Sequence, residues 1–235
     1  YKGHAIGRNI LGNEKSVMNF NQNDIRKFML QNYSTHEMVL SSVGNINFNK
    51  LIFLCEKYFG NVEERERIRI RSKPNSYFPE FKTVRKNTHQ SHCMTGNLAF
   101  DAQDKRRTTA ALLNNILGGP GMNSRLNMSL REKSGYSYNI ESQYTAYSDT
   151  GLLSVYFGSD KDKFEKSLNL VFKEFQKLRD KKLGDLQLKK AKRQLIGQIA
   201  IASENNEHYM LTQGKQILLF NKTESPEELS RKINE

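Results

Sequence analysis

The pattern that most limits the fold lies at residues 136–159. The stretch YSYNIESQYTAY (136–147) alternates along its length, SDTG follows as a turn, and GLLSVYFGS (151–159) continues as a second strand-like stretch. Two such stretches joined by a short turn predict an antiparallel hairpin. The apolar stretch TTAALLNNILGG (108–119) precedes the hairpin with a helical pattern, and apolar residues recur at helical spacing from Phe164 to Leu178 after it. The sequence therefore predicts a hairpin between two helices.

The amino-terminal third shows the order helix, strand, helix. Residues 23–31 predict a helix capped by Asn23 or Asp24, and residues 38–45 predict a short strand. Asn47 can cap a second helix, whose apolar residues recur on one face. The buried stripe expected on this face consists of Leu51, Leu54, Cys55, Tyr58 and Phe59.

A break follows these elements. RSKPNSYFPE (71–80) holds two of the four prolines, which predicts a linker. After the break, residues 82–100 predict an extended strand, and a last long helix begins near Asp185. A short echo joins the two ends of the chain, since GRNIL (7–11) and GKQIL (214–218) share three identities and each precedes a polar stretch and a capped helix. The echo predicts parts of two homologous domains.

The charge and cysteine content exclude several classes of protein. The formal net charge of +12 is spread over mixed-charge stretches and is not interleaved with aromatic residues, so we expect no nucleic-acid binding. No apolar run approaches the roughly 20 residues that cross a bilayer, so we expect no membrane association. The two cysteines form no disulfide framework and no C-x-x-C motif, which favours a reducing compartment such as the cytoplasm or an organelle matrix.

The glycine cluster GGPGMNSR (118–125) raises the question of a phosphate-binding loop. It has no Lys-Ser/Thr pair at Walker spacing, and G-x-G-x-x-G does not fit it. We therefore interpret Gly118 and Gly119 as the end of one helix, with residues 120–123 leading into the next. The histidines also lack the spacing of a complete zinc site: HEMVL (36–40) has Leu40 where a second histidine is needed, and HQSH (89–92) lies in a predicted strand.

Arg131 and Tyr138 remain as candidate functional residues. A guanidinium and a phenol hydroxyl both donate hydrogen bonds to a carbonyl oxygen or an oxyanion. A helix that begins near Asn123 and a strand that follows Gly135 can bring the two side chains to one corner. The alternative is structural, with Arg131 paired to a surface acid and Tyr138 packed in the sheet.

Residues 118–159 resemble the second domain of the insulinase, pitrilysin and mitochondrial processing peptidase family of zinc peptidases. The resemblance rests on the glycine cluster, SRL, LREK, the following glycine and aromatic residues, and SDTGLL. Residues 1–60 resemble the closing half of the family's first domain through YKGHAIGRNILG, MVLSSVGNI and EKYFG.

The resemblance implies an α+β fold, with antiparallel sheets flanked by helices in parts of two homologous domains. It implies that residues 1–72 close the first domain, 73–80 form a linker, and 81–235 form a truncated second, non-zinc domain. The family's H-x-x-E-H motif and its third zinc ligand would precede Tyr1, so we expect zinc to bind outside this chain. We expect this chain alone to bind no stoichiometric zinc and to cleave no peptide.

The resemblance also assigns roles to the two candidate residues. In active family members, an arginine in the LREK-like run and a tyrosine seven residues later contact the substrate near the zinc. Arg131 and Tyr138 match that spacing, whereas Tyr136 does not. The resemblance implies that they hold the scissile carbonyl and stabilise the oxyanion of a peptide enclosed in a chamber. The expected partners are a peptide substrate and either the zinc-bearing half-domain or a paralogous subunit.

We rank three possible functions. The first is the carboxyl-side, substrate-binding portion of a zinc metalloendopeptidase. The alternative is a non-catalytic paralogous subunit that binds peptides or scaffolds an active partner. A nucleic-acid-binding module ranks last, because it rests on the net charge alone.

Overall fold

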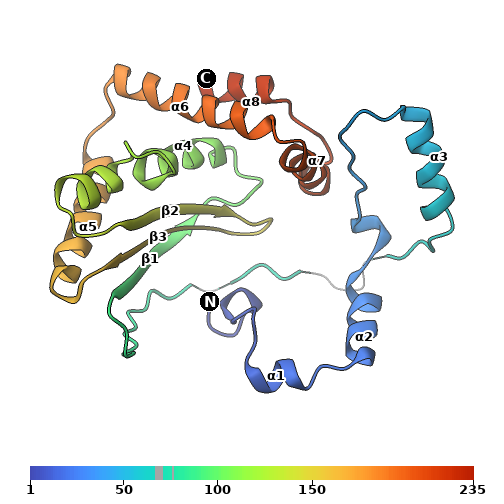
Figure 1. Ribbon diagram of the computed structural model, residues 1–235, viewed down its shortest axis with the longest axis horizontal. Helices are drawn as coiled ribbons and strands as arrows, with labels where there is room; N and C mark the ends of the chain where they lie inside the picture. The colour runs from blue at the N-terminus through green and yellow to red at the C-terminus, as the bar shows by residue number, and fades with distance from the viewer. Residues whose placement is uncertain (67–70, 76) are drawn as a thin grey trace. The chain divides into compact units, whose positions relative to one another are not determined.

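The computed structural model describes residues 1–66, 71–75 and 77–235. Its α-helices and strands are, in chain order, α1 (Glu14–Met18), α2 (Gln22–Asn32), α3 (Phe48–Phe59), β1 (Ser91–Ala99), α4 (Arg107–Gly118), β2 (Asn139–Ala146), β3 (Gly151–Ser159), α5 (Phe164–Asp180), α6 (Asp185–Ser203), α7 (Asn206–Phe220) and α8 (Pro226–Asn234) (Figure 1). A π-helical segment, η3, spans Asn127–Lys133, and short 3₁₀ helices lie at Ala5–Gly7, Thr35–Glu37 and Lys161–Lys163. None of the helices in the described ranges combines the length and apolarity that crossing a bilayer requires.

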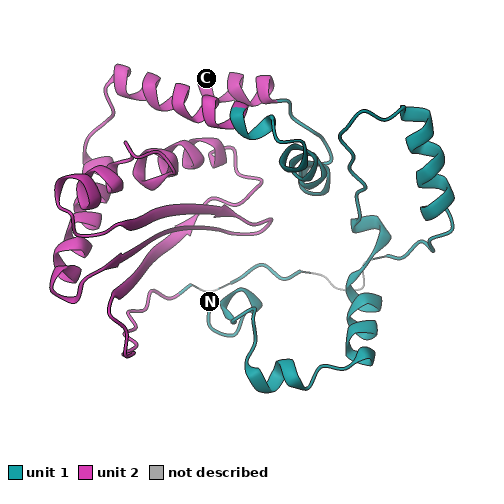
Figure 2. Cartoon of the chain, viewed as in Figure 1, with its two compact units in different colours: residues 1–77, 201–225 teal, residues 78–200, 226–235 magenta. Residues whose placement is uncertain are grey.

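The chain divides into two compact units, which Figure 2 colours separately. Unit 1 comprises residues 1–77 and 201–225, and unit 2 comprises residues 78–200 and 226–235. The boundary between Tyr77 and Phe78 falls inside the predicted linker, whereas unit 1 also takes residues that the sequence places in the second domain. The assignment to two homologous domains stays a prediction.

The sheet of unit 2 contains the predicted hairpin. β2 and β3 pair antiparallel, β1 pairs with the other edge of β3, and the strand order is β1-β3-β2. The turn closes where the amide of Tyr147 donates to the carbonyl of Thr150 at 2.8 Å. α4 packs on β2, and the helices of unit 2 lie on one side of the sheet (Figure 1). The hairpin between two helices is confirmed, and the fold is α+β.

The core of unit 2 lies between the sheet and these helices. Alternate residues of β3, Val155 and Phe157, are fully buried, while Tyr156 between them faces the other side. The buried apolar cluster consists of Leu117, Leu126, Leu130, Ile140, Val155, Phe157 and Val171. This core holds the end of α4, the helix of Arg131 and the start of β2 in fixed positions.

The helix predictions for unit 1 are largely confirmed. The side chain of Asn47 accepts the amide hydrogens of Asn49 and Lys50 and begins α3 as expected. α2 instead begins after Asn21, whose side chain accepts from the amides of Asn23 and Asp24. The N-cap is therefore Asn21 and not either predicted residue, because its side chain reaches the next two free amides.

Two predictions for unit 1 are wrong. Residues 38–45 form no strand, because no described strand of this unit lies beside them to pair with. The stripe on α3 is not buried: Tyr58 is 66% and Phe59 57% exposed. An amphipathic helix buries its apolar face only where another element covers it, and no strand covers α3 among the described residues of unit 1.

The predicted strand at 82–100 and the two echo segments also differ from expectation. Only Ser91–Ala99 of that strand pairs with a neighbour. GRNIL (7–11) lies at the end of a 3₁₀ turn and in a bend, whereas GKQIL (214–218) lies inside α7. A five-residue echo thus does not impose one conformation.

Candidate functional site

The glycine cluster forms the turn between α4 and the helix of Arg131. α4 ends at Gly118, and the amide of Gly119 donates to the carbonyl of Asn115 at 3.2 Å. A Cβ on Gly118 would lie 2.8 Å from the backbone nitrogen of Ser142 and 2.9 Å from Cδ1 of Leu126. Glycine at 118 therefore permits close packing of α4 on β2. The interpretation of these glycines as a turn is confirmed.

A cavity of about 240 Å³ opens beside this turn. Asn123 and Gln194 exchange two amide hydrogen bonds of 2.8 and 3.2 Å there, and these bonds attach α6 to the turn. The lining residues are Asn115, Ile116, Asn123, Ser124, Arg125, Leu183, Gln187, Lys190, Ala191 and Gln194. The lining holds two cations and no aromatic side chain.

The helix that carries Arg131 begins after the turn and becomes π-helical at Asn127. Leu126 and Leu130 are fully buried, which anchors the helix on the core. Arg131 follows Leu130 directly and is exposed, with its Nε 3.5 Å from Oε1 of Glu132. Single-turn π segments occur often at functional sites, because the wider turn displaces a side chain from the regular helical position.

A glycine turn joins this helix to β2. The amide of Tyr136 donates to the carbonyl of Leu130 at 2.8 Å, and Gly135 has φ of +62°. Ser137 is buried, and its hydroxyl donates to the carbonyl of Gly158 at 2.7 Å. Tyr138 comes next and is 80% exposed. Buried neighbours thus fix the backbone on which each candidate side chain stands.

The structure places Arg131 and Tyr138 on opposite sides of this turn, both at the surface. Among the described residues, no hydrogen bond or ion pair joins them, and the hydroxyl of Tyr138 has no partner. Tyr136 differs, because its ring lies 5.9 Å from Nζ of Lys163 and is half-buried. Of the two tyrosines after Gly135, Tyr138 is the more exposed.

The described residues hold no group of three or more His, Cys, Asp or Glu side chains arranged to bind a metal ion. The histidines have other contacts: Nε2 of His4 lies 3.0 Å from the carbonyl of Ser72, and Nε2 of His36 lies 3.1 Å from Oε1 of Glu64. Zinc needs three or four protein ligands around one point. The described residues therefore do not fit a zinc ion.

Cys93 does not supply a reactive thiolate. Burial, and next the negative charge of Glu165, raise the pKa of its thiol above the ordinary value. A thiol with a raised pKa is protonated at neutral pH and is a weak nucleophile. Both Cys93 and Cys55 are free.

The structure also brings together one polar pair that the sequence did not predict. His92 and Tyr156 lie on neighbouring strands, and Nδ1 of His92 is 2.8 Å from the Tyr156 hydroxyl. The sequence showed only a histidine in a predicted strand and a tyrosine 64 residues later. The register of β1 on β3 is the signal that brings them together, and it is not visible in the sequence.

Comparison with known proteins assigns the family. The model of the family described as Peptidase M16 inactive domain matches residues 19–195. The Bacillus subtilis protein named uncharacterized zinc protease YmxG is 29% identical over 234 residues, which are 100% of this chain and 56% of that protein. The beta subunit of the Saccharomyces cerevisiae mitochondrial-processing peptidase is 26% identical over 250 residues, 100% of this chain and 54% of that subunit.

Solved structures show the same fold. The peptidase M16 inactive domain from Pseudomonas fluorescens superposes with a TM-score of 0.87 at 22% identity, covering 100% of this chain and 56% of that one. A chain of complex III2 from Candida albicans gives a TM-score of 0.83 at 18% identity, with coverage of 100% and 57%. The chain spans about half the length of the relatives it matches. The resemblance stated from the sequence is confirmed: this chain belongs to the M16 peptidase family and carries the carboxyl-side part described as its inactive domain.

Proposed function

We propose that this chain is the substrate-binding, carboxyl-side portion of a zinc metalloendopeptidase that hydrolyses peptides in a closed chamber. Arg131 and Tyr138 contact the scissile carbonyl and its oxyanion. One observation carries the proposal: an exposed guanidinium and an exposed phenol lie on either side of the Gly135 turn, on backbone that buried neighbours hold. Relatives in Bacillus subtilis and Streptomyces coelicolor are named as zinc proteases, which supports it.

The chemistry of the two side chains suits this role. Arginine offers a planar set of N–H donors with a permanent charge, and tyrosine offers one O–H donor. Donors held in place before the reaction stabilise a developing oxyanion without reorganising. Leu130 and Ser137 supply that support here, since both are buried and each precedes one of the two donors. Glu132 is exposed, so its contact with Arg131 costs little to break.

In this proposal the zinc ion binds outside this chain. The described residues do not fit the ion. We propose that its ligands lie in the other half of the longer protein. This chain alone then binds peptides without cleaving them.

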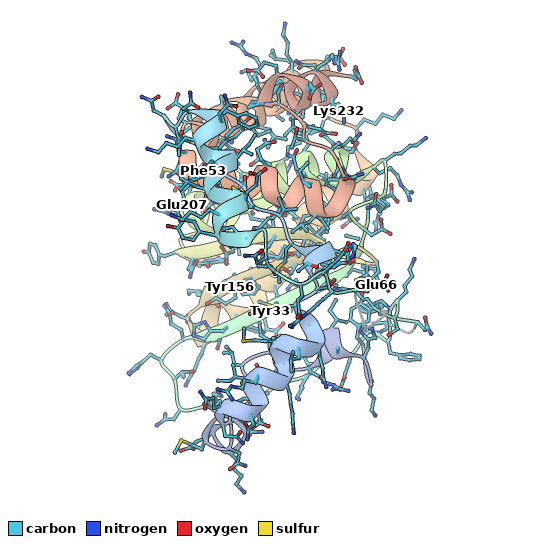
Figure 3. The ribbon with its side chains drawn as sticks, turned by 90° about the vertical axis from the view of Figure 1, so that its right-hand side faces the viewer. Tyr33, Phe53, Glu66, Tyr156, Glu207 and Lys232 are labelled. Atoms are coloured by element: carbon cyan, nitrogen blue, oxygen red, sulfur yellow. The ribbon has the colours of Figure 1, made fainter. Side chains whose placement is uncertain are left out.

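The exposed apolar faces of unit 1 support a protein partner. Ile25 and Phe28 of α2 are 57% and 56% exposed, and Phe48 and Phe53 of α3 are 70% and 61% exposed (Figure 3 labels Phe53). Exposed apolar faces on consecutive helices are typical of surfaces that another element covers. We propose that the zinc-bearing half-domain covers these faces. A paralogous subunit is the other candidate.

The second candidate function is a non-catalytic subunit that binds peptides or scaffolds an active partner. One observation favours it: a relative across the whole chain is named a subunit of a processing peptidase. In this case the Arg131 and Tyr138 donors bind a peptide carbonyl without a reaction.

The test uses the full-length protein that contains this chain, an internally quenched unfolded peptide, and metal analysis. The active-peptidase proposal expects one zinc per protein and cleavage. Removing one oxyanion donor by Arg131→Gln or Tyr138→Phe is expected to lower kcat about 100- to 1,000-fold with zinc content unchanged. Arg179→Gln and Tyr77→Phe are matched controls, since Arg179 pairs with Asp180 on α5 and Tyr77 packs on Tyr1. A zinc-free, inactive protein that still binds the peptide favours the subunit function instead.

A further inference from the structure

His92 of β1 and Tyr156 of β3 form a polar pair on the face of the sheet opposite the helices of unit 2 (Figure 3 labels Tyr156). Nδ1 of His92 lies 2.8 Å from the Tyr156 hydroxyl, and the two rings are nearly parallel at 15° with centroids 6.1 Å apart. The ring of His92 is exposed and Tyr156 is half-buried. The stacking and the hydrogen bond hold both side chains in one arrangement before any ligand arrives.

The pair lies above Gly158. Gly158 is the register partner of His92, and a Cβ built on it would lie 3.6 Å from Oε1 of Gln90, 3.6 Å from Nδ1 of His92 and 3.7 Å from the Tyr156 hydroxyl. The backbone of Gly158 is buried beneath the two side chains. The polar atoms of the pair therefore stand close to the sheet, where a ligand lying flat on this face would meet them.

Gly158 also connects the pair to the site proposed above. Its carbonyl accepts the hydrogen bond from the hydroxyl of Ser137, the residue before Tyr138. Asn139, the residue after Tyr138, is the other register partner of Gly158. His92, Tyr156 and Tyr138 thus lie at the same end of the sheet, around Gly158.

The hydrogen bond between His92 and Tyr156 leaves one donor that can bind an acceptor on a ligand. When Tyr156 donates to Nδ1, Nε2 of His92 carries a hydrogen; when Nδ1 donates instead, the Tyr156 hydroxyl is free to donate. Either tautomer leaves one N–H or O–H donor for a ligand. A main-chain carbonyl oxygen is one acceptor that such a donor binds.

The rest of this face suits an extended peptide. On β1, Met94 and Leu98 are 73% and 47% exposed and offer apolar contact. On β2, Asn139, Glu141 and Gln143 are exposed and polar. An extended peptide places alternate side chains on opposite sides and presents carbonyls at regular spacing. It can therefore meet the apolar strip and the donor together.

We propose that His92 and Tyr156 form a subsite that donates a hydrogen bond to a main-chain carbonyl of an extended peptide substrate. The subsite rests on the proposed function and lies at the end of the sheet where β2 begins, directly after Tyr138. It binds the peptide away from the scissile bond, and so contributes to affinity and not to the chemical step.

The experiment measures KM and kcat of the full-length protein with the quenched peptide, for His92→Phe, Tyr156→Phe and the double variant. Losing one hydrogen bond is expected to raise KM about 2- to 10-fold. We expect kcat to stay within about twofold, because the oxyanion donors are untouched. The double variant is expected to be no worse than the more affected single variant, since the two residues share one donor. His89→Phe and Tyr77→Phe are the controls and keep the wild-type KM.

A second readout separates this proposal from the proposed function. In ¹⁵N-histidine-labelled protein, peptide addition is expected to shift the ring-nitrogen signals of His92 and leave those of His89 unchanged. Cleavage with a KM in His92→Phe and Tyr156→Phe equal to that of the controls overturns the subsite alone. A wild-type protein that cleaves nothing overturns the enzyme proposal, and the His92 signals then support or overturn the subsite independently. Thermal unfolding of each variant checks that the fold is retained.

Discussion

The backbone carbonyl of Arg131 accepts the amide hydrogen of Gly135 at 3.0 Å, and this bond closes the turn that leads from the π-helical segment into β2. The turn also requires φ of +62° at Gly135. Non-glycine residues reach this region at a cost, because Cβ approaches the following carbonyl oxygen. The position of Tyr138 relative to Arg131 therefore depends on one glycine.

We predict that Gly135→Ala lowers the free energy of unfolding by about 1–2 kcal/mol. A Cβ at position 135 would meet no atom within 4 Å, so the cost is conformational and not steric. Gly135→Asn is expected to cost less, since asparagine tolerates this backbone region. Denaturant unfolding measures both; equal loss in the two variants would contradict the conformational explanation.

At Gly118 a larger side chain is predicted to destabilise the fold by a steric clash and not by backbone strain. Its φ is not in the left-handed region, but an added Cβ would lie 2.8 Å from the nitrogen of Ser142. We expect Gly118→Ala to destabilise unit 2 by about 1–3 kcal/mol through overpacking. Gly184→Ala is the control, because a Cβ there meets nothing within 4 Å. Urea unfolding monitored by circular dichroism gives both values, and a neutral Gly118→Ala would show that α4 can move away from β2.

The core prediction concerns Phe157. This side chain is fully buried and packs at 5.9 Å against the ring of Phe164. Phe157→Ala is expected to cost about 3–5 kcal/mol, from lost burial and the cavity left behind. Phe81 is 85% exposed, so Phe81→Ala is expected to change stability by less than about 0.5 kcal/mol. Chemical denaturation of the two variants tests whether the core centres on β3.

The pKa of Asp104 gives a pH prediction. Hydrogen bonds from the Arg106 side chain and then from its backbone amide lower the pKa of this carboxyl from 3.8 to about 2. Because the folded-state pKa is depressed, the contribution is present above the ordinary pKa and is lost as the pH falls toward about 2. The stability difference between wild type and Asp104→Asn should therefore shrink across this window. Carbon-detected NMR titration measures the pKa directly, and Arg106→Ala should move it back toward 3.8.

The thiol of Cys93 is predicted to react slowly in the folded protein. The raised pKa of Cys93 leaves little thiolate at neutral pH, so Cys55→Ser protein should react slowly with a disulfide reagent. The rate is expected to increase as the pH rises and to become fast on unfolding in urea. A fast reaction of folded Cys55→Ser protein at pH 7 would contradict the burial of Cys93.

Much of unit 2 follows from local pattern. Alternation at 136–147, followed by the turn SDTG and the strand-like stretch 151–159, predicts the hairpin because a strand exposes and buries successive side chains. Apolar residues that recur every three or four positions predict α4 and α5, because this spacing places them on one face of a helix. In unit 1 the same reasoning predicts the caps of α3, but it fails for the buried stripe and for the strand at 38–45. Local pattern shows which face is apolar and does not show whether anything covers it.

The sequence by itself therefore determined α3, α4, α5, the hairpin, the glycine turn and the family, because each depends on residues close together in the chain or on a motif in order. It did not predict α1 or α7. Only the tertiary structure decided that Tyr138 is largely exposed whereas Tyr136 is half-buried beside Lys163. It also decided the pairing of His92 with Tyr156, which are 64 residues apart. Contacts of this kind depend on strand register, and register is set by the packing of the whole sheet against its helices.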